Sequence, residues 1–227
     1  MKFKVNKSKE AIADSGSMNF IGKSGIYDVV IDFASIAASS GGAESVNFNI
    51  DYNGNKQTIW GPYVQDKQGN ELSIGANLIN KLAIIAGEDD QLTTAEESFP
   101  VGKDQEEKEF TIIEQFSDLA VKMRVQEEYS TYKGQIQQKI VIKAFFREDE
   151  ASAEEIINES EIGVAFAKEQ KYADRITYAP SSKGANDAPT PEEVAEWAAN
   201  GYGRGNSSSS ATTAKVVAPK KAMFGKK

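Results

Sequence analysis

The sequence predicts a mainly β fold, a small five-stranded barrel with one helix between its third and fourth strands. Apolar and polar residues alternate over two separate parts of the chain, 26–64 and 119–147, as they do in half-buried strands. Residues 76–87 lie between these parts and carry apolar side chains at helical spacing instead. With 227 residues the chain is long enough for one such domain and additional segments.

Three strands are predicted in the first part. After a short run at 18–21, residues 26–33 form the first long strand, with one face made by Tyr27, Val29, Ile31 and Phe33. Residues 44–52 form the second, with one face made by Val46, Phe48, Ile50 and Tyr52. Asn53-Gly54 follows at once and predicts a tight hairpin, because both residues tolerate positive φ. Residues 56–64 should therefore pair back as the third strand.

A helix and a loop are predicted next. The helix over 76–87 carries Leu78, Leu82 and Ile85 on one face and ends at Gly87 as its C-cap. Residues 88–109 are acidic and contain Pro100 and Gly102, which predicts a solvated loop.

The fourth and fifth strands, 119–129 and 135–147, form a second hairpin around 130–134. Alternation predicts an inward face made by Leu119, Val121, Met123, Val125, Ile136, Ile140, Ile142, Ala144 and Phe146. The opposite face would then hold Phe145 and five cations, namely Lys122, Arg124, Lys139, Lys143 and Arg147.

The resulting order, β-β-β-α-β-β, is that of the oligonucleotide-binding (OB) barrel, although a small open sheet covered by one helix has the same order. We expect an N-terminal arm at 1–16 and the barrel at 17–147. An acidic helical extension at 148–180 and a linker, short helix and disordered basic tail at 181–227 should follow. The short helix is indicated by Thr190 as N-cap and Pro191 at the first helical position.

The chain contains no His and no Cys, which excludes a Ser-His-Asp triad and a Cys/His zinc site. We therefore expect a non-enzymatic protein without a cofactor or bound metal. A Mg²⁺-dependent enzyme is a weaker alternative, because Asp28 and Asp32 would lie about 13 Å apart along a strand. Without cysteines, a signal-peptide run or a long apolar stretch, the sequence predicts a cytoplasmic protein that does not enter the membrane.

The formal net charge is −8, yet the charges are segregated along the chain. Residues 118–147 carry six basic and three acidic side chains, and 201–227 carry six basic and none acidic. Single-strand binders combine such cations with aromatic rings on which bases stack. Solvation and edge protection are the alternative roles for cations on an exposed strand. The candidate binding residues are Lys56, Trp60, Tyr63, Lys122, Arg124, Tyr129, Tyr132, Lys133, Lys139, Lys143, Phe145 and Arg147.

The segments GIYDVVIDF, NFNIDYNGNKQTIWGPYV, LINKLAIIAG and the final long hairpin together resemble phage-encoded single-stranded DNA-binding proteins over residues 17–147. The resemblance implies sequence-tolerant DNA binding in replication, recombination or repair, in the host cytoplasm. It also implies replication or recombination proteins as partners, through residues 148–227, and is compatible with a homo-oligomer. Such proteins commonly end in an acidic tail, whereas 220–227 here is basic. The competing hypothesis is a protein-interaction module in which the barrel is only a scaffold.

Overall fold

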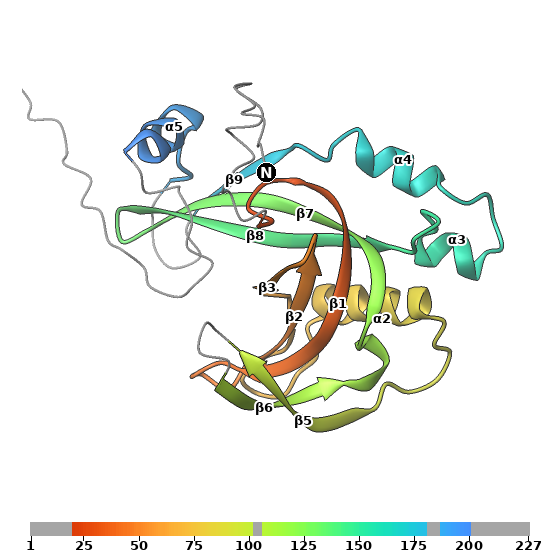
Figure 1. Ribbon diagram of the computed structural model, residues 1–227. Helices are drawn as coiled ribbons and strands as arrows, with labels where there is room; N and C mark the ends of the chain where they lie inside the picture. Colours follow the sequence, from red (N-terminus) through yellow and green to blue (C-terminus); the bar gives the residue numbers. More distant parts are fainter. Residues whose placement is uncertain (1–19, 102–105, 181–186, 201–227) are drawn as a thin grey trace, which may run out of the picture.

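The computed structural model describes residues 20–101, 106–180 and 187–200, and it is mainly β. Its strands belong to one strongly curled, open sheet, a half-barrel whose inner side holds the core (Figure 1). In chain order the described strands are β1 (Gly25–Ala38), β2 (Glu44–Tyr52), β3 (Asn55–Ile59), β4 (Tyr63–Gln65), β5 (Thr94–Val101), β6 (Glu106–Ile113), β7 (Leu119–Tyr132), β8 (Gln135–Phe146) and β9 (Ile176–Ala179). The described helices are α2 (Ser73–Ala86), a 3-10 turn η1 (Glu114–Phe116), α3 (Ala153–Ile157), α4 (Val164–Gln170) and α5 (Pro191–Ala199).

The long strand β1 organises the sheet. One of its edges pairs with β2, and the other pairs with β7 along its first half and with β6 near its end. A bulge between Ile31 and Phe33 shifts the register in the middle of the strand. Because a bulge bends its strand and increases the local twist, one strand can serve three partners in different directions. The sheet is open over the described residues, where β8 pairs only with β7 and β3 only with β2.

The β2–β3 hairpin is confirmed. Asn53 and Gly54 have φ values of 53° and 79°, as a tight primed turn requires, and the Gly54 N–H donates to Asp51 Oδ1 at 2.7 Å. The predicted third strand is interrupted, however. Pairing with β2 stops after Ile59 and resumes only in β4 at Tyr63.

The predicted helix is confirmed as α2, and Gly87 caps it in the left-handed conformation at φ 86°. Its N–H donates to the carbonyls of Ala83 and Ile84, which satisfies groups that the helix end leaves free. Ile79, Leu82 and Ile85 are buried against the inner side of the sheet. Helix α2 therefore closes one end of the core.

The predicted solvated loop at 88–109 is wrong, because most of it forms the β5–β6 hairpin. Phe99 and Phe110 lie on one face of this hairpin and pack on Phe33, with ring centroids 3.9 and 5.1 Å from the Phe33 ring. The bulge in β1 turns Phe33 away from the face of Ile31, so its predicted place on that face is also wrong. The acidic composition of the hairpin did not indicate the small aromatic cluster that Phe33, Phe99 and Phe110 form on the outer side of the sheet.

The β7–β8 hairpin is confirmed, with Lys133 and Gly134 at positive φ in its turn. A second bulge lies opposite Arg124 and Val125, whose partners are Ala144 and Ile142, so Lys143 has no partner. From Ala144 to Phe146, each side chain of β8 therefore faces the side of the sheet opposite to the predicted one.

This inversion exchanges the predicted faces of Phe145 and Phe146. Phe145 is buried in the core, 5.3 Å from the ring of Phe48, and Phe146 lies on the outer face against Phe166 of α4. The expectation that Phe145 faces outward beside the cations is therefore wrong.

Beyond β8 the chain passes through α3 and α4 and returns to the sheet as β9, which runs parallel to β7. The side chain of Thr190 accepts a hydrogen bond from the Glu193 N–H at the start of α5. The predicted arm at 1–16 and the predicted tail from 201 lie outside the described residues. Among the helices of the described ranges, none is both long and apolar enough to cross a membrane.

Glu155 connects α3 to the start of α4 and is 6% exposed. Its carboxylate accepts hydrogen bonds from the backbone N–H groups of Ser152 and Ala165, both at 2.8 Å, and of Gly163 at 3.4 Å. Burial acts to raise the pKa of Glu155, but these backbone donors outweigh it and hold the pKa below its ordinary value. The carboxylate therefore stabilises the α3–α4 turn in its ionised form.

We expect Glu155→Ala to lower the free energy of unfolding at pH 7 by about 2–3 kcal/mol, because several donors to a charged acceptor lose their partner. Since the folded-state pKa is lowered, this contribution is present above the ordinary pKa of a glutamate and is lost as pH falls through the folded-state value. Urea denaturation from pH 7 down to pH 3 should show the two proteins converging. Glu159→Ala, at an exposed position nearby, is the control. An equal loss in both variants, or a loss that does not depend on pH, would contradict this account.

Candidate nucleic-acid interface

The outer face of the β2–β3 hairpin is polar. The pairs Phe48–Ile59 and Ile50–Gln57 face the core, so the alternate pairs Asn49–Thr58 and Asp51–Lys56 face outward. Thr58 Oγ1 donates to Asn49 Oδ1 at 2.6 Å, and Lys56 Nζ lies 3.0 Å from Asp32 Oδ2. This face offers hydrogen-bonding groups and one cation to solvent.

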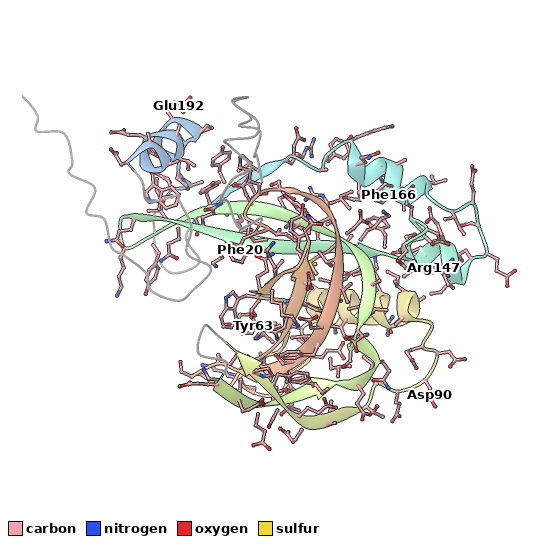
Figure 2. All side chains as sticks on the ribbon, viewed as in Figure 1. Phe20, Tyr63, Asp90, Arg147, Phe166 and Glu192 are labelled. Atoms are coloured by element: carbon pink, nitrogen blue, oxygen red, sulfur yellow. The ribbon has the colours of Figure 1, made fainter. Side chains whose placement is uncertain are left out.

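Two large aromatic rings lie next to this face. Trp60 follows directly after β3 and is 70% exposed, and Tyr63 at the start of β4 is 52% exposed. In Figure 2 Tyr63 lies between the β7–β8 hairpin above and the β5–β6 hairpin below. Most tryptophans are largely buried, and two exposed rings three residues apart make this part of the molecule a candidate contact surface.

The backbone that carries these rings is held firmly. A Cβ atom at Gly61 would lie 1.8 Å from the Val46 carbonyl oxygen, so only glycine allows this approach to β2. The Gly61 N–H donates to Asn47 Oδ1 at 3.3 Å, and the Val46 N–H donates to the Pro62 carbonyl at 3.1 Å. The short segment from Trp60 to Tyr63 is therefore attached to β2 at several points, which preorganises both rings.

A similar close approach holds the far end of this segment. A Cβ atom at Gly75, in the first turn of α2, would lie 2.0 Å from the carbonyl oxygen of Tyr63. The Leu72 N–H donates to the Val64 carbonyl at 2.8 Å. The polypeptide around Tyr63 is thus fixed between β2 and α2.

The predicted row of five cations does not form one open face. Arg124 is only 2% exposed, because α4 and the residues after it cover this part of β7. Its guanidinium donates to the carbonyl oxygens of Val125 and of Tyr172, the latter at 2.6 Å, and lies 3.8 Å from Glu169. Burial lowers its pKa, with Glu169 and Asp174 acting in the opposite direction. The expectation that Arg124 is accessible to a ligand is wrong.

The remaining four cations divide into two kinds. Lys122 Nζ lies 2.7 Å from Asp28 Oδ1, and Arg147 forms a bidentate ion pair with Asp149. Lys139 and Lys143 are exposed and form no ion pair within the described residues. Lys143 lies at the bulge, beside the groove between β8 and α3–α4, whereas Lys139 lies in the part of β8 nearer the hairpin turn.

Tyr129 is also buried, at 7% exposure, which is inconsistent with its predicted role in stacking on bases. Its ring packs on Tyr178 of β9 and edge-on against Trp197 of α5. Its hydroxyl donates to Glu127 Oε1 at 3.0 Å. Burial, followed by this hydrogen bond, raises the pKa of Tyr129 above its ordinary value. Tyr129 holds α5 and β9 on the hairpin and is not free to bind a ligand.

Two further predicted binding residues, Tyr132 and Lys133, lie at the turn of this hairpin. Lys133 is exposed, and its Nζ lies 5.3 Å from the centre of the half-buried Tyr132 ring. The predicted residues that remain accessible are Lys56, Trp60, Tyr63, Tyr132, Lys133, Lys139, Lys143 and Arg147. No binding role was predicted for Asn49 and Thr58, although the alternating polar residues at 47, 49 and 51 were a signal for this face.

Neither a protein-family model nor a curated protein matches this chain. Its function is therefore inferred from its own residues.

Proposed function

We propose that this chain binds single-stranded DNA without strong sequence preference, on the outer face of β2–β3 and along the segment from Trp60 to Tyr63. The observation that carries the proposal is the pair of exposed rings on a backbone that is attached to β2 and α2. Bases stack on such rings whatever their identity, because each base has a π-face. The adjoining Lys56, Asn49 and Thr58 supply polar contacts for a backbone.

The arrangement of strands supports an OB-type barrel as the finer description of the fold. In that fold, oligonucleotides bind on the face of strands two and three, between the loop after strand one and the loop between strands four and five. Here β1, β2, β3 with β4, α2, β7 and β8 follow the same order, and β5–β6 is an insertion after the helix. The β7–β8 turn, with Tyr132 and Lys133, then takes the place of the second flanking loop.

The biological role follows from this binding mode and from the resemblance to phage-encoded single-stranded DNA-binding proteins. Such a chain covers single strands during replication, recombination or repair. A metal-dependent enzyme has less support, since Asp28 and Asp32 are each paired with a lysine.

The test is a fluorescence-anisotropy titration of labelled oligothymidine at about 50 mM and 200 mM salt, with duplex DNA of equal length as competitor. We expect binding that weakens steeply with salt, because neutralised phosphates release counterions, and that duplex does not displace. Tryptophan emission should be quenched on binding in wild type and in Trp197→Phe, but not in Trp60→Phe. Absence of binding at the lower salt concentration would reject the proposal and favour the protein-interaction module.

A further inference from the structure

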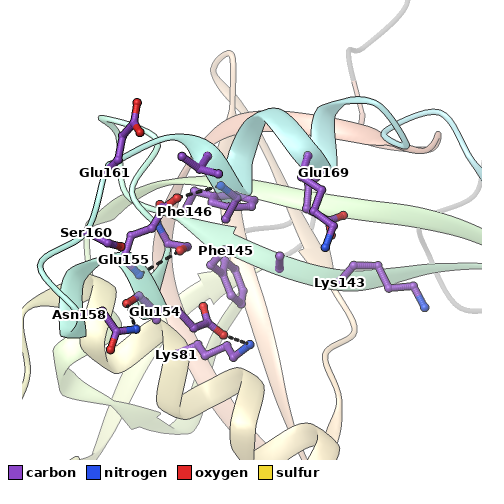
Figure 3. Close-up of a pocket in the computed structure, with 16 residues that line it drawn as sticks. Lys81, Lys143, Phe145, Phe146, Glu154, Glu155, Asn158, Ser160, Glu161 and Glu169 are labelled. Atoms are coloured by element: carbon purple, nitrogen blue, oxygen red, sulfur yellow. Dashed lines mark hydrogen bonds and ion pairs between the residues drawn. The ribbon is translucent and has the colours of Figure 1, made fainter.

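A groove of about 610 Å³ lies between β8 and the α3–α4 segment, on a part of the molecule that the proposed DNA interface does not use (Figure 3). Phe145, Phe146, Ala153 and Ala165 are among its lining residues. These apolar side chains lie among charged ones, since the lining also includes Lys81, Lys143, Lys168, Glu154, Glu155, Glu161 and Glu169.

The α3–α4 segment beside the groove exposes apolar side chains. Ile157, Ile162 and Val164 are 63%, 49% and 58% exposed, and all three lie in the eight residues from 157 to 164. Single exposed apolar residues are ordinary, but Val164 also lines the groove, and several exposed apolar residues in a segment beside a groove are typical of a docking surface. We refer to Ile157, Ile162, Val164 and the groove as the α3–α4 surface.

The chain that forms α3 and its flanking turns is acidic. Residues 148–162 carry seven acidic and no basic side chains. Glu154 is paired with Lys81 at 2.5 Å and Asp149 with Arg147 at 2.7 Å, and Glu155 is satisfied internally. Glu159 and Glu161 are exposed and form no ion pair within the described part of the chain. A complementary ligand would combine apolar side chains with several positive charges.

The chain itself contains a segment with this composition. Residues 214–227, AKVVAPKKAMFGKK, carry five lysines and no acidic residue, together with Val216, Val217, Met223 and Phe224. We propose that this segment docks on the α3–α4 surface of its own chain, with Phe224 at the groove and the lysines facing Glu159 and Glu161. This docking does not depend on the proposed DNA binding.

The connecting chain is long enough for docking within one molecule. Trp197 of α5 contacts Tyr129, and Phe166 of α4 contacts Phe146, which is paired with Lys122. Lys122 and Tyr129 are seven residues apart on β7, or about 23 Å. The thirteen residues from 201 to 213 span up to about 43 Å when extended. The segment can therefore reach the groove from the end of α5.

The absence of cysteine makes a site-specific test possible in the full chain. Ser160 lines the groove, and Ser98 is an equally polar and exposed position on β5. We would compare Ser160→Cys/Gly225→Cys with Ser98→Cys/Gly225→Cys under mild oxidation, and follow intramolecular disulfide formation on non-reducing gels. We expect the Ser160 pair to form at least about tenfold faster at low salt, because docking raises the effective concentration of the two thiols.

Adding Phe224→Ser, Lys220→Ser and Lys221→Ser to both double-cysteine proteins should remove this difference. High salt should reduce it, because the exposed charges are screened. Equal rates for the two pairs would overturn the proposal. Disulfide-linked dimers as the main product of the Ser160 pair would also overturn it, since a second copy would then occupy the surface.

Discussion

Replacing Trp60 by alanine is expected to weaken oligothymidine binding by roughly 5- to 140-fold, which corresponds to the 1–3 kcal/mol that one stacked base contributes. The stability of the protein should change little, because the ring is 70% exposed and its removal leaves no cavity. Anisotropy titrations at one fixed salt concentration measure the affinity, and thermal melting measures the stability.

Ile176→Ala is the control for this variant, because it removes an exposed apolar side chain from β9, which pairs with β7 and not with β2 or β3. Its affinity should equal that of wild type. The slope of log affinity against log salt should be unchanged in Trp60→Ala, since the tryptophan contacts bases and not phosphates. Wild-type affinity in Trp60→Ala would place base stacking elsewhere on the molecule.

Gly61→Ala is expected to lower the free energy of unfolding by about 2–3 kcal/mol. The added methyl would lie 1.8 Å from the Val46 carbonyl oxygen, and 2.9 Å from the ring of Phe48. A backbone oxygen in a sheet cannot move aside easily, so the segment from Trp60 to Tyr63 must separate from β2. Urea denaturation measures the loss.

Gly41→Ala provides the comparison, because the nearest atom to its added methyl is Ser39 Oγ at 3.8 Å. Its stability should stay within about 0.5 kcal/mol of wild type. Gly61→Ala should also weaken DNA binding, since both rings are carried by the displaced segment. If the two glycine variants were equally stable, the close approach of Gly61 to β2 would be incorrect.

Several elements could be predicted because their signals are local. The Asn53-Gly54 turn, the end of α2 at Gly87 and the β7–β8 hairpin depend on backbone preferences of a few neighbouring residues. The β5–β6 hairpin could not be predicted in this way. Its strands contain many acidic residues and Pro100, and only the distant Phe33 provides the packing partner for its aromatic residues.

The sequence by itself determined the mainly β class, the strands before α2, the final β7–β8 hairpin and the exclusion of His- and Cys-dependent chemistry. Tertiary structure alone decided which predicted binding residues reach solvent. The bulges near Asp32 and Lys143 invert the alternation, and one shifted residue exchanges the two faces of a strand. Arg124 lies on the outer face of β7, as predicted, but α4 and the residues after it cover it. Tyr129 is covered by β9 and α5. Burial of this kind depends on contacts between residues about 40 to 70 positions apart, which no local pattern records.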